Sequence, residues 1–284
     1  MDTKTGKLYI VATPIGNLGD LSPRAVEVLR GADLIAAEDT RNTLKLLNHF
    51  QIGTPMTSYH EFNRFEKAEE LVKKLLEGSS IALVSDAGTP CISDPGQVLA
   101  KRCHECGIPV SPVPGPSAAI AALSASGFAS SRFVFEGFLP PKKQAKERRE
   151  MLKRLENETG TIILYEAPHH LKAALEDLTE TLGGGRRICL CRELTKLHEE
   201  IVICTLKEAM QTEPRGEYVL VIEGADPEKL KAEKAAAFDE LSLEEHMELY
   251  LSKGMDRKEA MKQVARDRGL SKRDIYNRLE KEAD

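Results

Sequence analysis

Short apolar runs alternate with amphipathic segments along the first part of the chain. A short uninterrupted apolar run predicts a buried strand, whereas apolar residues at helical spacing predict a helix. The predicted strands cover residues 8–12, 33–37, 81–84 and 110–113, and the predicted helices cover residues 22–30, 67–76 and 97–106. Strands that alternate with helices predict a parallel sheet with helices on both faces.

The pattern changes after PGPSAAIAALSASG, and a second α/β unit is predicted there. Its strands cover residues 133–138, 161–165, 187–191, 201–205 and 218–223. Its helices cover the basic segment PPKKQAKERREMLKRL and residues 169–181 and 206–210. Residues 225–237 form a charged, alanine-rich connector that is either helical or flexible.

Three further helical segments follow Ser242. Gly254 and Gly269 close the first two of these helices, and Ser271 is placed to cap the third. This spacing is typical of a helix-turn-helix module. The expected fold class is therefore α/β, with α/β domains at residues 1–122 and 123–225 and a small C-terminal helical appendage at residues 240–284.

Composition narrows the class of protein. The chain has 284 residues and a formal net charge of −5, so contact with nucleic acid would need a local basic patch. It has no apolar run of bilayer-spanning length and no signal-peptide pattern, so we expect a cytoplasmic protein with no membrane partner. Cys103 and Cys106 have CxxC spacing, but a second ligand pair is missing, so we expect no metal site.

Glycine, proline, hydroxyl and carboxylate residues are concentrated after the predicted strands, at residues 13–17, 38–41, 85–96 and 114–119. In an open parallel sheet, ligands bind at the carboxyl ends of the strands. Turns and helix caps would explain any one of these loops, but four such loops favour a ligand site. Neither GxGxxG nor GxxxxGK[ST] occurs in them, and Asp86 and Asp94 would repel a polyphosphate. We therefore expect a ligand with a cationic or hydroxyl-rich part.

A known family has similar loops. The chain resembles the ribosomal RNA small-subunit methyltransferase I family of the tetrapyrrole methylase superfamily in TPIGNLGDLSPRA, AEDTR, LVSDAGTPCISDPG, PGPSAAIAAL, LYEAPHHL and RELTKLHEE. The resemblance covers nearly the whole chain. It implies two α/β domains with S-adenosylmethionine in the cleft between them, and usually a homodimer. It also implies methylation of a cytidine ribose 2′-hydroxyl in the decoding region of 16S ribosomal RNA, in the small ribosomal subunit.

The resemblance also implies which residues contact the cofactor. From the first domain these are Pro14, Gly16, Asp86, Ala87, Gly88, Thr89, Pro90, Ile92, Ser117, Ala118 and Ala119. From the second domain, Tyr165 and Glu166 would close the pocket. A sulfonium is a cation, so nearby carboxylates would attract it.

Methyl transfer to a hydroxyl requires alignment of oxygen, carbon and sulfur, together with removal of the hydroxyl proton. The candidate proton acceptors are Glu38, Asp39, Glu166, His169, Lys196, Glu199 and Glu200. We favour the segment Glu38 to Arg41, because its carboxylates could orient a hydroxyl while Arg41 holds a phosphate, and we retain Glu166 as a catalytic candidate. A helix cap with a salt bridge is the alternative role of Asp39 and Arg41.

Basic residues gather in two segments of this acidic chain. Residues 142–154 carry an excess of five positive charges, and the C-terminal helices carry a similar excess. Clusters of this kind are the footprint of phosphate binding, although a solvated helix or a packing module would explain them too. The candidate RNA contacts are Lys142, Lys143, Lys146, Arg148, Arg149, Lys196, Lys272 and Arg273.

Two other functions remain open at this point. A methylase of tetrapyrrole intermediates would share the cofactor loops but would not need the basic segments. A non-enzymatic nucleic-acid-binding regulator that senses a metabolite would use the helix-turn-helix-like end of the chain, but would leave the strand-exit loops unexplained.

Overall fold

The computed structural model describes residues 5–236, 238 and 241–282. Its first sheet has five strands in the order β3-β2-β4-β1-β5, and all pairings are parallel. The strands are β1 (Leu8–Val11), β2 (Leu34–Ala37), β3 (Met56–Ser58), β4 (Ile81–Val84) and β5 (Val110–Val113). The pairing aligns Ala37 with both Ser58 and Val84, so the strand-exit loops share one edge of the sheet.

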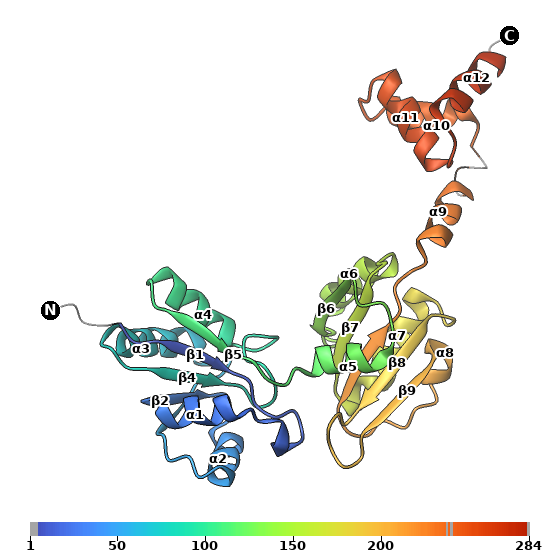
Figure 1. The fold of residues 1–284 in the computed structure, drawn as a ribbon. Coiled ribbons are helices and arrows are strands. Elements are labelled where there is room, and N and C mark those ends of the chain that lie inside the picture. Colours follow the sequence, from blue (N-terminus) through green and yellow to red (C-terminus); the bar gives the residue numbers. More distant parts are fainter. Residues whose placement is uncertain (1–4, 237, 239–240, 283–284) are drawn as a thin grey trace.

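Helices cover both faces of this sheet, as predicted (Figure 1). On one face lie α1 (Pro23–Gly31) and α2 (Thr40–His49), and on the other lie α3 (Arg64–Leu76) and α4 (Gly96–Glu105). The prediction missed α2 and β3. The reason is that α2 buries only Thr43 and Leu47, and the three residues of β3 contain no apolar run.

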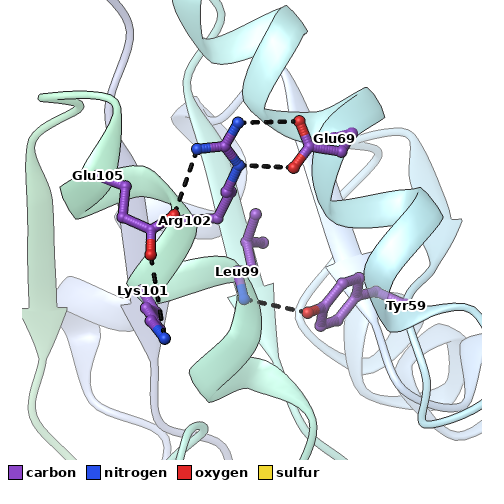
Figure 2. A network of polar contacts seen from close by, with 6 residues as sticks. All are labelled: Tyr59, Glu69, Leu99, Lys101, Arg102 and Glu105. Carbon is purple, nitrogen blue, oxygen red and sulfur yellow. Dashed lines mark hydrogen bonds and ion pairs between the residues drawn. The ribbon is translucent and has the colours of Figure 1, made fainter.

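A polar network joins the residue after β3 to the first turn of α4 (Figure 2), and a further bond from the same residue holds the loop between β4 and α4. The hydroxyl of Tyr59 donates to the Pro95 carbonyl at 3.1 Å and accepts from the Leu99 amide at 3.1 Å. On the outer surface, Arg102 Nε donates to Glu69 Oε1 at 2.6 Å and ties α4 to α3. Because Tyr59 is buried, its hydroxyl bonds hold the loop that carries Asp94 without competition from water.

The second sheet is mixed. Its order is β6-β7-β10-β8-β9; the β6–β7 pairing is parallel, and the other described pairings are antiparallel. The strands are β6 (Phe133–Phe138), β7 (Thr161–Glu166), β8 (Arg187–Arg192), β9 (Glu200–Thr205) and β10 (Tyr218–Ile222). One face packs against α6 (Ala145–Glu156), α7 (Pro168–Leu182) and α8 (Leu206–Ala209).

The other face of the second sheet packs against α5 (Ala118–Ser126). This helix follows β5 of the first sheet, yet Ala119, Ala122 and Leu123 belong to the core of the second sheet. Figure 1 shows α5 lying beside the second sheet, at the end of the segment that crosses between the domains. The predicted boundary after residue 122 falls within α5, so the passage between the two domains precedes this helix.

The C-terminal part is helical. The connector contains α9 (Pro227–Ala236), and it leads to α10 (Leu243–Leu251), α11 (Arg257–Asp267) and α12 (Lys272–Glu282). These last three helices share a small core of their own and stand apart from the two sheets (Figure 1). Ser271 accepts from the Asp274 amide at 3.1 Å, as expected of a cap. Residues 1, 240 and 284, the outer limits of the predicted first and third domains, lie outside the described residues.

None of the described helices is both long enough and apolar enough to cross a membrane.

Candidate functional site

A cavity of about 380 Å³ lies between the two α/β domains, and we call it the site cavity. Many of the predicted residues line it: Glu38, Asp86, Ala87, Gly88, Thr89, Ile92, Ser117, Ala118, Tyr165 and Glu166. The first domain supplies its strand-exit loops, and the second supplies the end of β7. The structure therefore brings together residues as far apart in sequence as Ile15 and Val219.

Several lining residues were not among the predicted cofactor contacts. Four of them lie within the predicted strand-exit loops: Ile15, Ser85, Ser93 and Asp94. The others come from the second domain and were not predicted: Phe138, Ala167, Glu217, Tyr218 and Val219. The wall from β10 arises because β10 pairs antiparallel with β7, which sets Tyr218 opposite Glu166. No local sequence signal marks such a pairing. Phe138 is a large apolar residue that stays exposed at the end of β6. Its ring meets the ring of Tyr165 edge-on at 5.6 Å.

The loop between β4 and α4 is held in an unusual shape. Thr13 and Gly88 exchange backbone hydrogen bonds of 2.9 and 3.0 Å, which ties this loop to the loop after β1. Asp94 Oδ1 accepts from the Cys91 amide at 2.9 Å and from the Gly96 amide at 2.7 Å. Cys91 has a φ of 69°, in the left-handed region. Such strain persists only where surrounding contacts fix it, and it concentrates at functional sites.

Two glycines allow the domains to approach each other beside the cavity. A Cβ on Gly137, whose φ is 67°, would lie 2.7 Å from Ser93 Oγ. A Cβ on Gly16 would lie 2.4 Å from Lys196 Cγ and 3.0 Å from the Leu194 carbonyl oxygen. Both positions therefore exclude larger residues, and both contacts close the cavity between the domains.

Carboxyl groups dominate the electrostatics of the site cavity. Burial raises the pKa of Glu38, and the nearby charge of Asp86 raises it further. Burial also raises the pKa values of Asp94 and Glu166. Glu166 is only 5% exposed, and its Oε1 accepts from the Ala167 amide at 2.9 Å. A cavity with this surplus of carboxylates favours a cationic group over an anionic one.

Asp39 and Arg41 do not line the site cavity. Asp39 caps α2 by accepting from the Arg41 amide at 2.8 Å, and it forms an ion pair with the Arg41 side chain at 2.7 Å. The hydrogen bond from that side chain lowers the pKa of Asp39 to about 2. Asp39 and Arg41 therefore form the helix cap and salt bridge predicted as their alternative role. The amide of Asp39 also donates to Asp86 Oδ1 at 3.0 Å, so it positions a residue of the cavity wall.

The remaining predicted cofactor residues lie close behind or beside the cavity. Pro90 and Ala119 are buried outside its lining, and the Ala119 amide donates to the Tyr165 hydroxyl at 3.3 Å. Pro14 and Gly16 line a second cavity of about 210 Å³, which we call the α2 cavity.

The other candidate proton acceptors lie outside the lining of the site cavity. The rings of His169 and His170 contact each other at the start of α7. Glu199 accepts from the Thr195 amide at 2.6 Å, and Glu200 accepts from Arg192 Nε at 2.9 Å. The hydrogen bonds of Glu199 and Glu200 give these two side chains structural roles.

The basic segment forms one wall of an open groove between α6 and α7, of about 620 Å³, which we call the α6–α7 groove. Lys142 and Arg149 line it, and Lys143 and Lys146 are exposed nearby. Among the described residues, none pairs with Lys143, Lys146 or Arg149. Lys142 Nζ lies 3.9 Å from Glu176 Oε2. The remaining predicted contacts differ in their surroundings: Lys196 pairs with Glu193 and Glu217, whereas Lys272 and Arg273 are exposed at the start of α12.

Arg148 corrects the prediction of RNA contacts. It is 7% exposed, and its guanidinium donates to Asp177 Oδ2 at 2.6 Å and to the Pro140 carbonyl at 2.7 Å. Arg148 lies on the face of α6 that packs against α7, whereas Glu147 and Arg149 are exposed to solvent. Arg148 is therefore a structural residue that joins α6 to α7.

Comparisons with known proteins agree with this architecture. The model of the family described as Tetrapyrrole (Corrin/Porphyrin) Methylases matches residues 7–210. A Synechocystis protein named ribosomal RNA small subunit methyltransferase I is 52% identical, over 98% of this chain and 99% of its own. A protein of the same name from Halalkalibacterium halodurans is 49% identical, over 96% and 94%.

Solved structures share the fold at low identity. Uroporphyrin-III C-methyltransferase from Thermus thermophilus, complexed with S-adenyl homocysteine, has a TM-score of 0.56 at 17% identity, over 77% of this chain and 97% of that one. A diphthine synthase has a TM-score of 0.58 at 14% identity, over 77% and 90%.

We predict that Arg148→Ala lowers the free energy of unfolding by about 1–3 kcal/mol, because it leaves the partly buried acceptors at Asp177 and Pro140 without their charged donor. Arg149→Ala, one position along the same exposed helix, is the matched control and should leave stability unchanged. Urea denaturation followed by circular dichroism measures both. Equal midpoints for the two variants would contradict the structural role.

Glu166→Gln should stabilise the protein at neutral pH. Between the ordinary pKa of a glutamic acid and the raised pKa of Glu166, the folded chain holds a proton that the unfolded chain has lost. The contribution of Glu166 to stability therefore falls as pH rises through that interval. Glutamine keeps the hydrogen bond from Ala167 but cannot ionise. The gain over wild type should disappear below the ordinary pKa, and urea denaturation at pH 4 and pH 7 tests this; a gain that is independent of pH would contradict it.

Proposed function

The chain belongs to the tetrapyrrole (corrin/porphyrin) methylase family and, within it, to the ribosomal RNA small subunit methyltransferase I group, and we propose that it methylates a cytidine ribose 2′-hydroxyl in the decoding region of 16S ribosomal RNA. The proposed methyl donor is S-adenosylmethionine. The proposal rests mainly on the acidic site cavity. Its lining includes Asp86 and Asp94 from the first domain and Glu166 from the second. The shared name of the relatives supports ribosomal RNA as the substrate class.

The residues of the site cavity fit the proposed donor. A volume of about 380 Å³ falls within the usual range of small-molecule sites. Ser117 and the segment from Asp86 to Thr89 offer backbone and hydroxyl groups for the polar ends of the donor, and Tyr165 offers an aromatic surface. Bound there, S-adenosylmethionine would supply a methyl group on a sulfonium, whose charge Asp94 and Glu166 would attract.

Glu38 is the proposed proton acceptor. It lines the site cavity beside Asp86, whose negative charge adds to the effect of burial on the Glu38 pKa. Its raised pKa brings it closer to neutral pH, where a carboxylate accepts a proton more readily. Asp39 has the opposite shift and is held in an ion pair. We therefore assign the proton to a Glu38 carboxylate oxygen and give Asp39 and Arg41 a positioning role.

The exposed cations in and beside the α6–α7 groove are the proposed contacts to RNA phosphates. Lys143, Lys146 and Arg149 present charges that no described residue neutralises, which favours binding to a polyanion. A methylase of tetrapyrrole intermediates would have no use for this surface. The non-enzymatic regulator is disfavoured because the carboxylates and strained loop of the site cavity would have no purpose.

A cytoplasmic homodimer in contact with the small ribosomal subunit is part of the proposal. Ile201, Val202 and Ile203 are exposed on β9, at the edge of the second sheet. An apolar edge strand of this kind is usually covered by another chain, which supports a dimer.

We predict that the purified protein transfers labelled methyl from S-adenosylmethionine to small ribosomal subunits isolated from cells that lack this methyltransferase. A 2′-O-methyl group removes the hydroxyl that alkaline cleavage requires, so the modified nucleotide should appear as a gap in an alkaline ladder. Glu38→Gln should reduce transfer about 100-fold while donor affinity stays near wild type. The same assay with free 16S RNA shows whether the substrate is the free RNA or the RNA within the assembled small subunit.

Three outcomes would contradict the proposal. Label on a base instead of a ribose would reject the 2′-hydroxyl as acceptor. Label only in added tetrapyrroles would favour the small-molecule methylase, and no transfer at all would favour the regulator.

Donor and RNA binding should be separable by mutation. Asp86→Ala removes a charge from the site cavity and should weaken donor binding on the order of tenfold. Lys143→Glu with Lys146→Glu should leave donor affinity unchanged, weaken RNA binding and reduce its salt dependence by about one unit of slope per lost phosphate contact. Calorimetry with the donor and filter binding with RNA at several salt concentrations measure the two effects.

The matched control is Lys73→Glu with Lys101→Glu, which reverses the same charges on α3 and α4. If this control weakened RNA binding as much as the first pair, net charge would be the cause, and Lys143 and Lys146 would lose their proposed role as RNA contacts.

A further inference from the structure

The α2 cavity adjoins the site cavity. It lies between the loop after β1 and the first turns of α2, and it shares Ser85 and Asp86 with the site cavity. Its volume is about 210 Å³. Two cavities with a common wall are what a two-substrate displacement needs, because the attacking oxygen must line up with the methyl group of the neighbouring ligand.

We propose that the α2 cavity binds the ribose of the acceptor nucleotide together with a flanking phosphate. This inference rests on the proposed function and adds the site at which the RNA substrate is held. Asn42 and Lys45 point to this ligand, since both line the cavity and none of the described residues pairs with either side chain. An amide that can donate and accept suits sugar hydroxyls, and an ammonium suits a phosphate.

The size of the cavity restricts the ligand further. Pro14, Leu18 and Leu46 form its apolar walls, and the space suits a single sugar but not a tetrapyrrole macrocycle. A nucleotide in such a recess must leave its base stack, as it does in other enzymes that modify single nucleotides within RNA or DNA.

Asp86 connects the two ligands. Its Oδ1 is fixed by the Asp39 amide at 3.0 Å, and the residue forms part of both cavity walls. The Asp39–Arg41 cap therefore acts on the reaction through Asp86. Lys196 of the second domain packs against Gly16, which lines the α2 cavity, so this domain lies next to the α2 cavity as well as to the site cavity.

Filling the cavity tests the inference. Leu18 is 41% exposed and lines the α2 cavity, whereas Leu44 is 47% exposed on α2 and does not line it. We expect Leu18→Trp to lower methyl transfer to small subunits by at least about tenfold, because the ring would occupy the space for the sugar. Donor affinity by calorimetry should stay within about twofold of wild type, and Leu44→Trp should match wild type in both measurements.

Removing the proposed phosphate contact gives an independent test. Lys45→Ala should raise the KM for small subunits about fivefold and reduce the salt dependence of RNA binding by about one unit of slope, with kcat and donor affinity unchanged. Lys73→Ala removes the same charge near the end of α3, at the opposite edge of the sheet, and should have neither effect.

The outcomes separate this inference from the proposed function. Wild-type protein that transfers no methyl to ribosomal RNA defeats the proposed function. Active wild type with a fully active Leu18→Trp variant defeats only the α2 cavity as the acceptor site. A Leu18→Trp variant that loses donor affinity would assign the cavity to the donor and overturn the inference. The circular dichroism melting curves of both tryptophan variants must coincide with that of the wild type. If Leu18→Trp melts at a lower temperature, the KM and salt dependence of Lys45→Ala decide whether the α2 cavity is the acceptor site.

Discussion

Parallel, in-register pairing of β2 with β3 and β4, and of β1 with β4 and β5, is the constraint on which the rest of this structure depends. Because the strands point the same way, every loop that leaves a strand emerges at one edge of the sheet. The loops after β1 and β4 are then close enough to exchange the Thr13–Gly88 hydrogen bonds. Glu38 reaches the same edge from β2, next to Asp86. One sheet therefore assembles a carboxylate-rich surface from segments that are distant in sequence.

The second domain completes the site through a different geometry. Antiparallel pairing of β7 with β10 sets the end of one strand beside the start of the other, so Glu166 and Tyr218 face the first domain together. Close approach then depends on Gly16 and Gly137, where a side chain would collide with the opposite domain. Buried carboxyl groups in this cleft cost stability, as the raised pKa of Glu166 indicates. Such a cost at a domain interface is typical of a ligand site rather than of a packing surface.

The sequence predicted what local patterns control and missed what tertiary pairing controls. Apolar runs such as Ile81–Val84 located the strands, and the cap at Ser22 located α1. The short strand β3 and the polar helix α2 left no such pattern, and the nearly uniform apolar character of α5 hid which sheet it covers. The strand-exit loops gave most of the first domain's share of the site, whereas the wall from β10 depended on a pairing that no motif encodes. Arg148 shows the same limit within a charged helix, because its burial depends on the position of α7.

Negative and positive side chains gather in different parts of this acidic chain. Carboxylates gather in the site cavity, whereas exposed lysines and arginines gather outside it, along α6 and at the start of α12. On the proposed function, this sorting separates two substrates of opposite charge: a cationic donor enters the acidic cleft, and a polyanionic RNA binds the outer surfaces and is repelled from the donor position. Methyl transfer converts a sulfonium into a neutral thioether, so the attraction of the site cavity for the spent donor falls as the reaction proceeds. The carboxylates that favour binding before the reaction therefore also favour release after it.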